Sequence, residues 1–417
     1  MKGLNSLGVD CIAKNVPHIA LLGSGGGQRA DVGFMGTLYQ MEKEGLLDTL
    51  VYVGGISGST WCMSSVYNDP EWSSKMDRAM SRLFRPGIEL KQILDWLYKQ
   101  MNDEDFSLSD VWGALTSAKF IKEMDQRHLS DEARRNTFNP YPIYNAVNKD
   151  CFTHGPTEGK WFELSPHEAG FTELGFFIET SLLGNKFKDG ELVEKKPEMD
   201  MVKLEGIFGS ALASWEVIKE YILNWLKVKL VGKIGRLIMD WEWGTTENFL
   251  YHDRTAPTYL SSKERFHLMD AGLLMNVPYP VFLGEKRDID LIIAPDYSAG
   301  KAFETLTLAR DYAAEVKKPF PEIDDKILKE RDCPNDCYVF EGKEKEPTIV
   351  YMPLFNRRNC KDAEEVKAKM DEFSTFHRPY NKEQIESLLE IVKANVTHNK
   401  GTLLKEINKA VRRREEK

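Results

Sequence analysis

Two consecutive strand–turn–helix units with glycine-rich turns constrain the fold of this chain more than any other feature. The apolar run Ile19-Ala20-Leu21-Leu22 leads into the turn Gly23–Ala30, and the run Leu50–Val53 leads into the turn Gly54–Thr60. Apolar residues at helical spacing follow each turn. Strands that alternate with helices indicate an α/β protein, in which the turns at the strand ends present functional groups.

The second turn places a serine between its strand and its helix. In Gly55-Ile56-Ser57-Gly58-Ser59 the small neighbours of Ser57 allow a sharp turn, which is the pattern of a nucleophile elbow. That pattern has glycine two residues after the nucleophile, whereas Ser59 stands there in this chain. Glycines and serines also form ordinary loops between strands and helices, so the turn alone leaves both interpretations open.

The first turn contains three consecutive glycines, Gly25–Gly27. Such a run is entropically costly and marks a place where backbone amides contact something, commonly a negative charge. A P-loop would need Gly-Lys-Ser/Thr, which is missing. Gly25, Gly27 and Ala30 fit a dinucleotide-binding pattern, but the second strand lacks the terminal acidic residue that holds the ribose. An oxyanion hole beside Ser57 fits the pattern better.

Two charged residues stand at further turns. Asp270 follows the strand-like run Phe266–Met269 and precedes small residues, a position suited to a catalytic acid and also common in simple turns. Arg29 begins the helix after the glycines, where it either adds positive charge to the site or is a surface arginine. If Ser57 and Asp270 act together, one catalytic unit with a long insertion is favoured over several independent domains.

Composition excludes several classes of protein. The 417 residues are 42% hydrophobic and carry a formal net charge of -9, which supports a large core and argues against bulk nucleic-acid binding. No apolar run approaches the roughly 18 residues of a membrane span. The six cysteines form neither a disulfide framework nor a zinc pattern, although Cys333 and Cys337 are close in sequence. We expect reduced thiols, no metal and a cytosolic protein.

The middle of the chain, from Asp69 to about residue 260, has mixed and mostly helical patterns. Helical spacing occurs at Leu90–Leu97, Leu115–Met124 and Leu212–Leu226. The polar stretch Gly184–Asp200 is either a lid or a solvated connection. The segment Lys219–Trp243 alternates apolar and basic residues, so it is either a membrane-surface helix or a cap helix with its lysines outward.

Three motifs in this order resemble the cytosolic (group IV) phospholipase A2 family. They are Ser24-Gly25-Gly26-Gly27-Gln28-Arg29-Ala30, Gly55-Ile56-Ser57-Gly58-Ser59-Thr60-Trp61 and Asp270-Ala271-Gly272-Leu273. The likeness runs from about Val16 into the tail and is strongest to the gamma-type, calcium-independent branch. Because it starts so near the first residue, we expect no calcium-binding C2 domain.

The resemblance implies an α/β lipase fold like that of patatin, with a central mixed sheet, helices on both faces and a long helical cap. Residues 1–417 would form a single catalytic domain with the cap insertion at roughly 70–260. The implied function is a calcium-independent phospholipase A2 with lysophospholipase and transacylase activity, acting on glycerophospholipids and lysophospholipids without a cofactor. The implied location is the cytoplasm, peripherally on intracellular membranes, with attachment through the segment around Trp225 or the terminal basic cluster.

The resemblance also assigns roles to residues of the site. Ser57 would be the nucleophile, Asp270 its partner in a dyad, Gly26 and Gly27 the oxyanion hole, Arg29 a contact for phosphate or developing charge, and Arg287 a second substrate-binding arginine. A serine–aspartate–histidine triad would need His377 or His398, the histidines that follow Asp270. The alternatives are a catalytically weak lipid-binding or assembly protein on a lipase scaffold and, less favoured, a dinucleotide enzyme.

Overall fold

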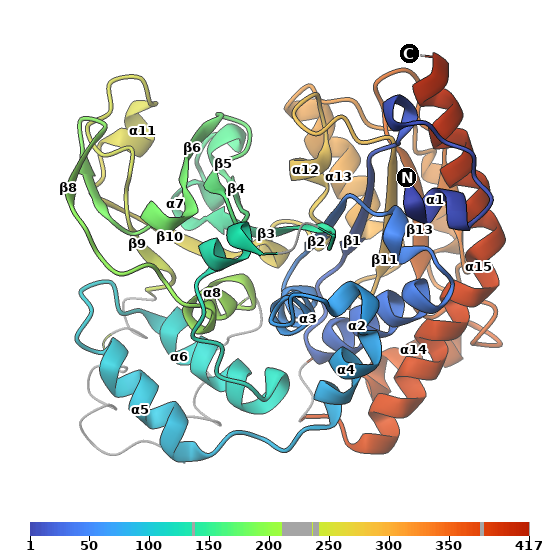
Figure 1. Cartoon of the computed structure of the whole chain (residues 1–417), viewed down its shortest axis with the longest axis horizontal. Helices are drawn as coiled ribbons and strands as arrows, with labels where there is room; N and C mark the ends of the chain where they lie inside the picture. Colours follow the sequence, from blue (N-terminus) through green and yellow to red (C-terminus); the bar gives the residue numbers. More distant parts are fainter. Residues whose placement is uncertain (136–137, 211–235, 237–241, 376–378, 417) are drawn as a thin grey trace. The chain divides into compact units, whose positions relative to one another are not determined.

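The computed structural model describes residues 1–135, 138–210, 236, 242–375 and 379–416 (Figure 1). The chain divides into two compact units. The first comprises Met1–Phe84, Asn136–Ile143 and Met275–Lys417, and the second comprises Arg85–Arg135 and Tyr144–Leu274. The insertion expected at roughly 70–260 overlaps the second unit, and its action as a cap stays a prediction.

A mostly parallel sheet forms the centre of the first unit. In spatial order its strands are β12 (Tyr338–Phe340), β13 (Thr348–Pro353), β11 (Leu291–Asp296), β1 (Ile19–Gly23), β2 (Tyr52–Gly55) and the first residues of β3 (Tyr141–Asn148). Only β12 runs antiparallel to its neighbour. Leu21 of β1 lies opposite Val53 on one side and Ile293 on the other. Every residue of β1, β11 and β13 is buried, as expected for parallel strands covered on both faces.

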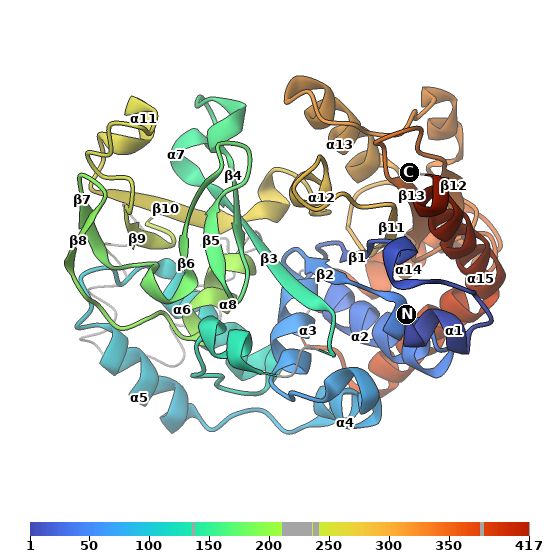
Figure 2. The same ribbon diagram turned by 45° about the horizontal axis from the view of Figure 1, so that its top comes forward.

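Two helices of the first unit, α2 (Gln28–Lys43) and α3 (Gly58–Tyr67), follow β1 and β2 directly. Its other helices are α1 (Lys2–Ser6), α4 (Met76–Ser81), α12 (Tyr279–Phe282), α13 (Glu304–Glu315), α14 (Ala363–Glu372) and α15 (Lys382–Glu416). All residues of α3 are buried. Helix α15 packs closely on α2, because a Cβ placed on Gly36 would lie 3.1 Å from a methyl group of Leu389. Figure 2 shows α15 beside β13, β12 and α14.

The end of α15 is held by internal ion pairs. Arg414 Nε lies 2.7 Å from Asp290 Oδ2, and Arg413 Nη2 donates to the carbonyl oxygen of Glu346. Arg414 also contacts Asp288. These two arginines of the terminal basic cluster are therefore engaged within the unit, which makes them poor candidates for the membrane attachment expected of the cluster. The other expected attachment segment, around Trp225, lies outside the described residues.

The second unit combines an antiparallel sheet with helices. Its strands are the remainder of β3, β4 (Trp161–Leu164), β5 (Glu168–Phe171), β6 (Phe176–Glu179), β9 (Thr245–Glu247) and β10 (Arg265–Asp270), with a separate hairpin of β7 (Lys186–Lys188) and β8 (Glu191–Glu194). Strand β10 pairs antiparallel with both β3 and β9. The helices are α5 (Leu90–Gln100), α6 (Leu108–Thr116), α7 (Lys149–Phe152), α8 (Met201–Phe208) and α11 (Thr258–Ser261).

The helix expected at Leu90–Leu97 is present as α5. The helical stretch expected at Leu115–Met124 is present only in part, because α6 ends at Thr116 and a π-helical turn follows over Ser117–Ile121. Strands β4–β6 were not predicted. The stretch Gly184–Asp200, expected to be a lid or a connection, contains the β7–β8 hairpin. The helical pattern at Leu212–Leu226 and most of Lys219–Trp243 lie outside the described residues. The strand predicted before Asp270 is confirmed as β10.

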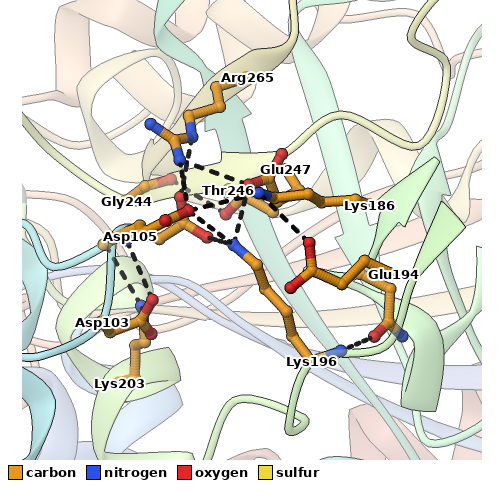
Figure 3. Close-up of polar contacts among 12 residues, drawn as sticks. Asp103, Asp105, Lys186, Glu194, Lys196, Lys203, Gly244, Thr246, Glu247 and Arg265 are labelled. Carbon is orange, nitrogen blue, oxygen red and sulfur yellow. Dashed lines mark hydrogen bonds and ion pairs between the residues drawn. The ribbon is translucent and has the colours of Figure 1, made fainter. Parts of the chain in front are cut away.

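A charged cluster joins the hairpin region to β9 and β10 (Figure 3). Lys196 lies 3.1 Å from Asp105 and 2.8 Å from Glu247, and Arg265 contacts the same two carboxylates. Lys203 on α8 lies 3.5 Å from Asp103. Because most of these groups are largely buried, we attribute to them a structural role that ties together segments far apart in the sequence.

Candidate active site

Ser57 occupies a strained turn between β2 and α3. Its φ of 52° and ψ of -121° lie in a region that residues other than glycine rarely adopt. Such a conformation costs on the order of 1–3 kcal/mol and persists only where the surrounding structure enforces it. The next residue begins α3, so strand, strained serine and helix follow in direct succession. The turn therefore has the geometry of a nucleophile elbow, as the sequence predicts.

The glycine turn after β1 packs directly against the turn that contains Ser57. A Cβ placed on Gly58 would lie 1.9 Å from the carbonyl oxygen of Gly27, and a Cβ placed on Gly25 would lie 3.3 Å from Ser57 Cβ. Both approaches depend on the missing side chains of these glycines. The structure thus brings together the two motifs that the sequence places at the ends of neighbouring strands.

Ser59 explains the departure from the usual elbow pattern. Its hydroxyl donates a 2.6 Å hydrogen bond to the carbonyl oxygen of Ser24, at the start of the glycine turn. The space that it fills is open because the facing residue is Gly23, where a Cβ would lie 2.5 Å from Ser59 Oγ. A serine at this position therefore ties the elbow to the glycine turn, which a glycine could not do.

Gly26 and Gly27 both adopt positive φ, of 145° and 60° respectively. Gly27 precedes the first residue of α2, so the partial positive charge of the helix N-terminus lies at this turn. Within the part of the chain that the structure describes, neither the Gly26 nor the Gly27 amide donates a hydrogen bond to a protein acceptor. By contrast, the amide of Gly25 donates to the carbonyl oxygen of Asn276. Two amides are thus available for an oxyanion, although their assignment to one remains a prediction.

Arg29 is 1% exposed and binds protein groups through all three nitrogen atoms of its guanidinium. Nε donates to the carbonyl oxygen of Tyr297, Nη1 to that of Phe373 and Nη2 to the hydroxyl of Thr375, at 2.7, 2.6 and 3.2 Å. Burial lowers the pKa of Arg29, and the nearby Tyr380 acts in the opposite direction. Through these bonds Arg29 holds the segments of Tyr297, Phe373 and Thr375 together next to the glycine turn. The contact of Arg29 with substrate phosphate or developing charge stays a prediction.

The residue before Arg29 holds the same stretch of chain. The side-chain oxygen of Gln28 accepts a 2.8 Å hydrogen bond from the backbone amide of Tyr380. Tyr297 also links this region, since its amide donates to Ser24 Oγ at 2.6 Å. A Cβ placed on Gly26 would lie 2.4 Å from the Tyr297 carbonyl oxygen, so Tyr297 closes one side of the glycine turn.

Asp270 is the last residue of β10 and is completely buried. Its Oδ1 accepts a 2.8 Å hydrogen bond from the amide of Gly272, and its own amide donates to the hydroxyl of Ser210. The carboxylate is thereby fixed at a strand end, as expected. Asp270 belongs to the second unit and Ser57 to the first, so their pairing remains a prediction.

Arg287 lies away from the Ser57 turn, at the opposite end of β2. Its guanidinium carbon is 5.9 Å from the ring centroid of Tyr52, the first residue of β2, and 5.8 Å from that of Phe282. Nη1 donates to the carbonyl oxygen of Val281. The structure does not bring Arg287 together with Ser57, and a substrate-binding role for it stays an untested prediction.

The remaining predictions concern histidines, cysteines, metal sites and membrane spans. His398 is exposed on α15, and His377 lies outside the described residues. All six cysteines are free thiols. Among the described residues, no group of histidine, cysteine, aspartate and glutamate side chains is arranged to hold a metal ion. In the same residues, no helix is both long and apolar enough to cross a membrane.

Sequence reasoning missed three residues that shape the site. Asn276 and Tyr297 support the glycine turn through backbone groups, and Thr375 reaches it from 346 positions away in the chain. Asn276 is part of the Asn-Val-Pro-Tyr-Pro stretch, so its motif was visible in the sequence. The backbone contacts of Tyr297 and the contact of the Thr375 hydroxyl with Arg29 leave no such signal in the sequence.

A strained serine between a buried strand and a helix, beside two available glycine amides, is the arrangement of a serine hydrolase. A family model described as the lysophospholipase catalytic domain matches residues 19–227. Cytosolic phospholipase A2 gamma from Homo sapiens is 32% identical, over 98% of this chain and 92% of that protein. The chain belongs to the cytosolic phospholipase A2 family, which confirms the identification made from the three motifs.

Solved structures of related proteins show the same fold. Human GIVD cytosolic phospholipase A2 is 24% identical and superimposes with a TM-score of 0.80, over 98% of this chain and 62% of that chain. The α/β lipase fold with a mixed sheet is thereby confirmed. The same human protein in complex with methyl gamma-linolenyl fluorophosphonate is 25% identical, with a TM-score of 0.76 over 99% of this chain and 62% of that chain.

Proposed function

We propose that this protein is a calcium-independent phospholipid acyl hydrolase, a phospholipase A2 with lysophospholipase and transacylase activity. The observation that carries the proposal is the strained Ser57 beside the available amides of Gly26 and Gly27. Family membership supports the enzyme class, and the fluorophosphonate complex of the human GIVD protein supports a lipid-shaped substrate. A metal is not required by the chemistry of a serine nucleophile with an aspartate partner.

In the proposed mechanism Ser57 Oγ attacks the ester carbonyl carbon of a glycerophospholipid while Asp270 takes up the hydroxyl proton. The oxyanion of the tetrahedral intermediate accepts hydrogen bonds from the amides of Gly26 and Gly27. The intermediate collapses, the bond to the glycerol oxygen breaks, and Asp270 returns the proton to the departing lysophospholipid. Water then hydrolyses the acyl-serine to release a fatty acid, or another lipid alcohol takes the acyl group.

A serine and an aspartate can suffice as a dyad, because hydrogen bonds that stabilise the tetrahedral intermediate lower the barrier, just as activation of the nucleophile does. An aspartate has a reference pKa near 3.9 and is a weak base in water. Complete burial of Asp270 removes water from its carboxylate, which strengthens its interaction with a proton donor. The amides of Gly26 and Gly27 then supply a large part of the rate enhancement.

The substrates would be glycerophospholipids and lysophospholipids taken from the surface of intracellular membranes, with the protein cytoplasmic and peripherally bound. Since Arg413 and Arg414 are engaged internally, we expect other surface residues to contact the bilayer. No cofactor enters the mechanism.

The proposal is tested by fatty-acid release from phospholipid vesicles with and without calcium. Ser57→Ala and Asp270→Asn should each abolish release, whereas the matched surface changes Ser74→Ala and Asp253→Asn should leave it unchanged. Undiminished turnover in Ser57→Ala or Asp270→Asn would remove the role proposed for that residue. Wild-type binding of lipid without any release would favour a lipid-binding protein on the same scaffold.

A further inference from the structure

A pocket in the first unit is lined by none of the residues of the Ser57 turn. Its volume is about 560 Å³, within the usual range of small-ligand pockets. It lies where β11 and β13 end and α14 covers them, and its lining includes Asp296, Tyr351 and Leu354. Ligands in α/β proteins commonly bind at the carboxyl ends of parallel strands, which is the location of this pocket.

Helix α14 contributes an apolar stripe to the pocket although none of its residues is buried. Ala363, Val366 and Met370 are spaced three and four residues apart, so they share one face of the helix, and all three line the pocket. A short helix owes most of its stability in a protein to burial of its apolar face. An apolar ligand under α14 would therefore complete the packing that this helix lacks.

The floor of the pocket is apolar and its buried polar groups are satisfied. Pro353, Leu354 and Phe355 form the part contributed by the chain after β13. The carboxylate of Asp296 accepts hydrogen bonds from Tyr351 Oη at 2.6 Å and from Ser298 Oγ at 2.6 Å. Since these polar groups already have partners, the interior is suited to a hydrocarbon chain.

The rim of the pocket carries balanced charge. Three basic side chains and three acidic side chains line it in addition to Asp296: Lys301, Arg331, Lys367, Asp332, Glu364 and Asp371. A purely anionic or purely cationic head group would meet as many like charges as opposite ones. A zwitterionic head group, with a phosphate and an ammonium, is complementary to both sets.

We propose that this pocket is an accessory binding site for a single-chain zwitterionic lipid, with the acyl chain under α14 and the head group at the charged rim. The ligand class is a lysophospholipid with a choline or ethanolamine head group. This binding does not depend on the hydrolytic reaction proposed for Ser57.

The pocket is connected to the glycine turn through the residue after α14. The carbonyl oxygen of Phe373 accepts a 2.6 Å hydrogen bond from Arg29, and the Phe373 ring stacks 6.1 Å from that of Phe355, which lines the pocket. A ligand that stabilises α14 would also stabilise the position of Phe373, the residue that directly follows the helix. Occupancy of the pocket should consequently stabilise the hydrogen bond between Arg29 and Phe373.

The test uses the full chain with Ser57→Ala, which prevents turnover of the ligand. Binding of lysophosphatidylcholine is measured below its critical micelle concentration, for example by equilibrium dialysis of a radiolabelled lipid. Val366→Asp and, separately, Met370→Asp place a carboxylate under the acyl chain and should weaken binding by about tenfold or more. Ala368→Asp is the matched control, because Ala368 is exposed on the same helix and does not line the pocket.

Saturable binding that is weakened in both pocket variants and retained in Ala368→Asp is the expected result. Thermal unfolding of each variant shows that it is folded, which we expect because α14 has no buried residue. Equal binding by pocket and control variants, or no saturable binding to Ser57→Ala, would overturn the proposal. Competition by free phosphocholine as strong as by the lipid would overturn the acyl-chain site. A fully active Ser57→Ala enzyme would refute the hydrolase proposal, and binding to the pocket would then be measured with a non-hydrolysable ether analogue of lysophosphatidylcholine.

Discussion

Replacing Gly58 by alanine tests how closely the elbow and the glycine turn must pack. The new Cβ would lie 1.9 Å from the carbonyl oxygen of Gly27, and real Cβ contacts essentially never fall below 3.0 Å. The two turns must therefore separate by at least about 1 Å, which can cost on the order of a hundredfold in rate when the reacting groups are displaced. A hundredfold loss corresponds to about 2.7 kcal/mol in the activation barrier.

The assay compares kcat for fatty-acid release from mixed micelles in Gly58→Ala and wild type. Gly401→Ala is the matched control, because a Cβ at Gly401 on α15 has no neighbour within 4 Å. Thermal unfolding of both variants separates misplacement of the site from loss of the fold. A Gly58→Ala enzyme that is folded and keeps more than about a third of wild-type kcat would refute the reasoning.

Three further predictions concern stability, each measured by denaturant unfolding. Ser59→Ala should lower the free energy of unfolding by about 1–3 kcal/mol, because the buried carbonyl oxygen of Ser24 loses its donor; an unchanged midpoint would contradict this role. Gly206→Ala should cost about 1–3 kcal/mol, because its Cβ would lie 1.8 Å from a backbone oxygen of α6; wild-type stability would contradict the close helix contact. Lys203→Met should cost about 3 kcal/mol at pH 7, because it leaves the buried carboxylate of Asp110 unpaired. Burial already raises the pKa of Asp110 and Lys203 opposes that shift, so the variant's stability should recover as the pH falls and Asp110 takes up a proton; a loss equal at pH 7 and pH 5 would contradict this.

The sequence predicts the first unit well because its strands are buried on both faces. Continuous apolar runs that end in glycines mark β1 and β2 within two residues of their observed bounds. The strained turn at Ser57 agrees with one of the two interpretations that the sequence left open, because a serine flanked by glycines between a strand and a helix fits a sharp elbow as well as an ordinary loop.

The second unit was harder to predict because its strands are short and pair antiparallel. Strands β4, β5 and β6 have four residues each, too few for a clear alternation of apolar and polar residues. The β7–β8 hairpin is polar and exposed, so its composition resembles that of a loop. Its turn residues Asp189 and Gly190 were the only local signal.

The partners of several side chains are set by tertiary contacts that no local sequence pattern predicts. Arg29 was expected to face substrate, and its partner Phe373 lies 344 positions away in the chain, beyond the reach of any local pattern. Ser59 read as a departure from the elbow pattern, and only the position of Ser24 shows its use. Arg287 matched the family by position alone, and its place beside Tyr52 follows from packing at the other end of β2.

The most direct test of the proposed mechanism is mass spectrometry of the intact protein and its peptides after reaction with a lipid-like fluorophosphonate. We predict one adduct per chain, on the peptide that contains Ser57, and labelling slowed by about a thousandfold or more in Asp270→Asn. An adduct on a different serine, or labelling of Asp270→Asn at the wild-type rate, would contradict the serine–aspartate dyad.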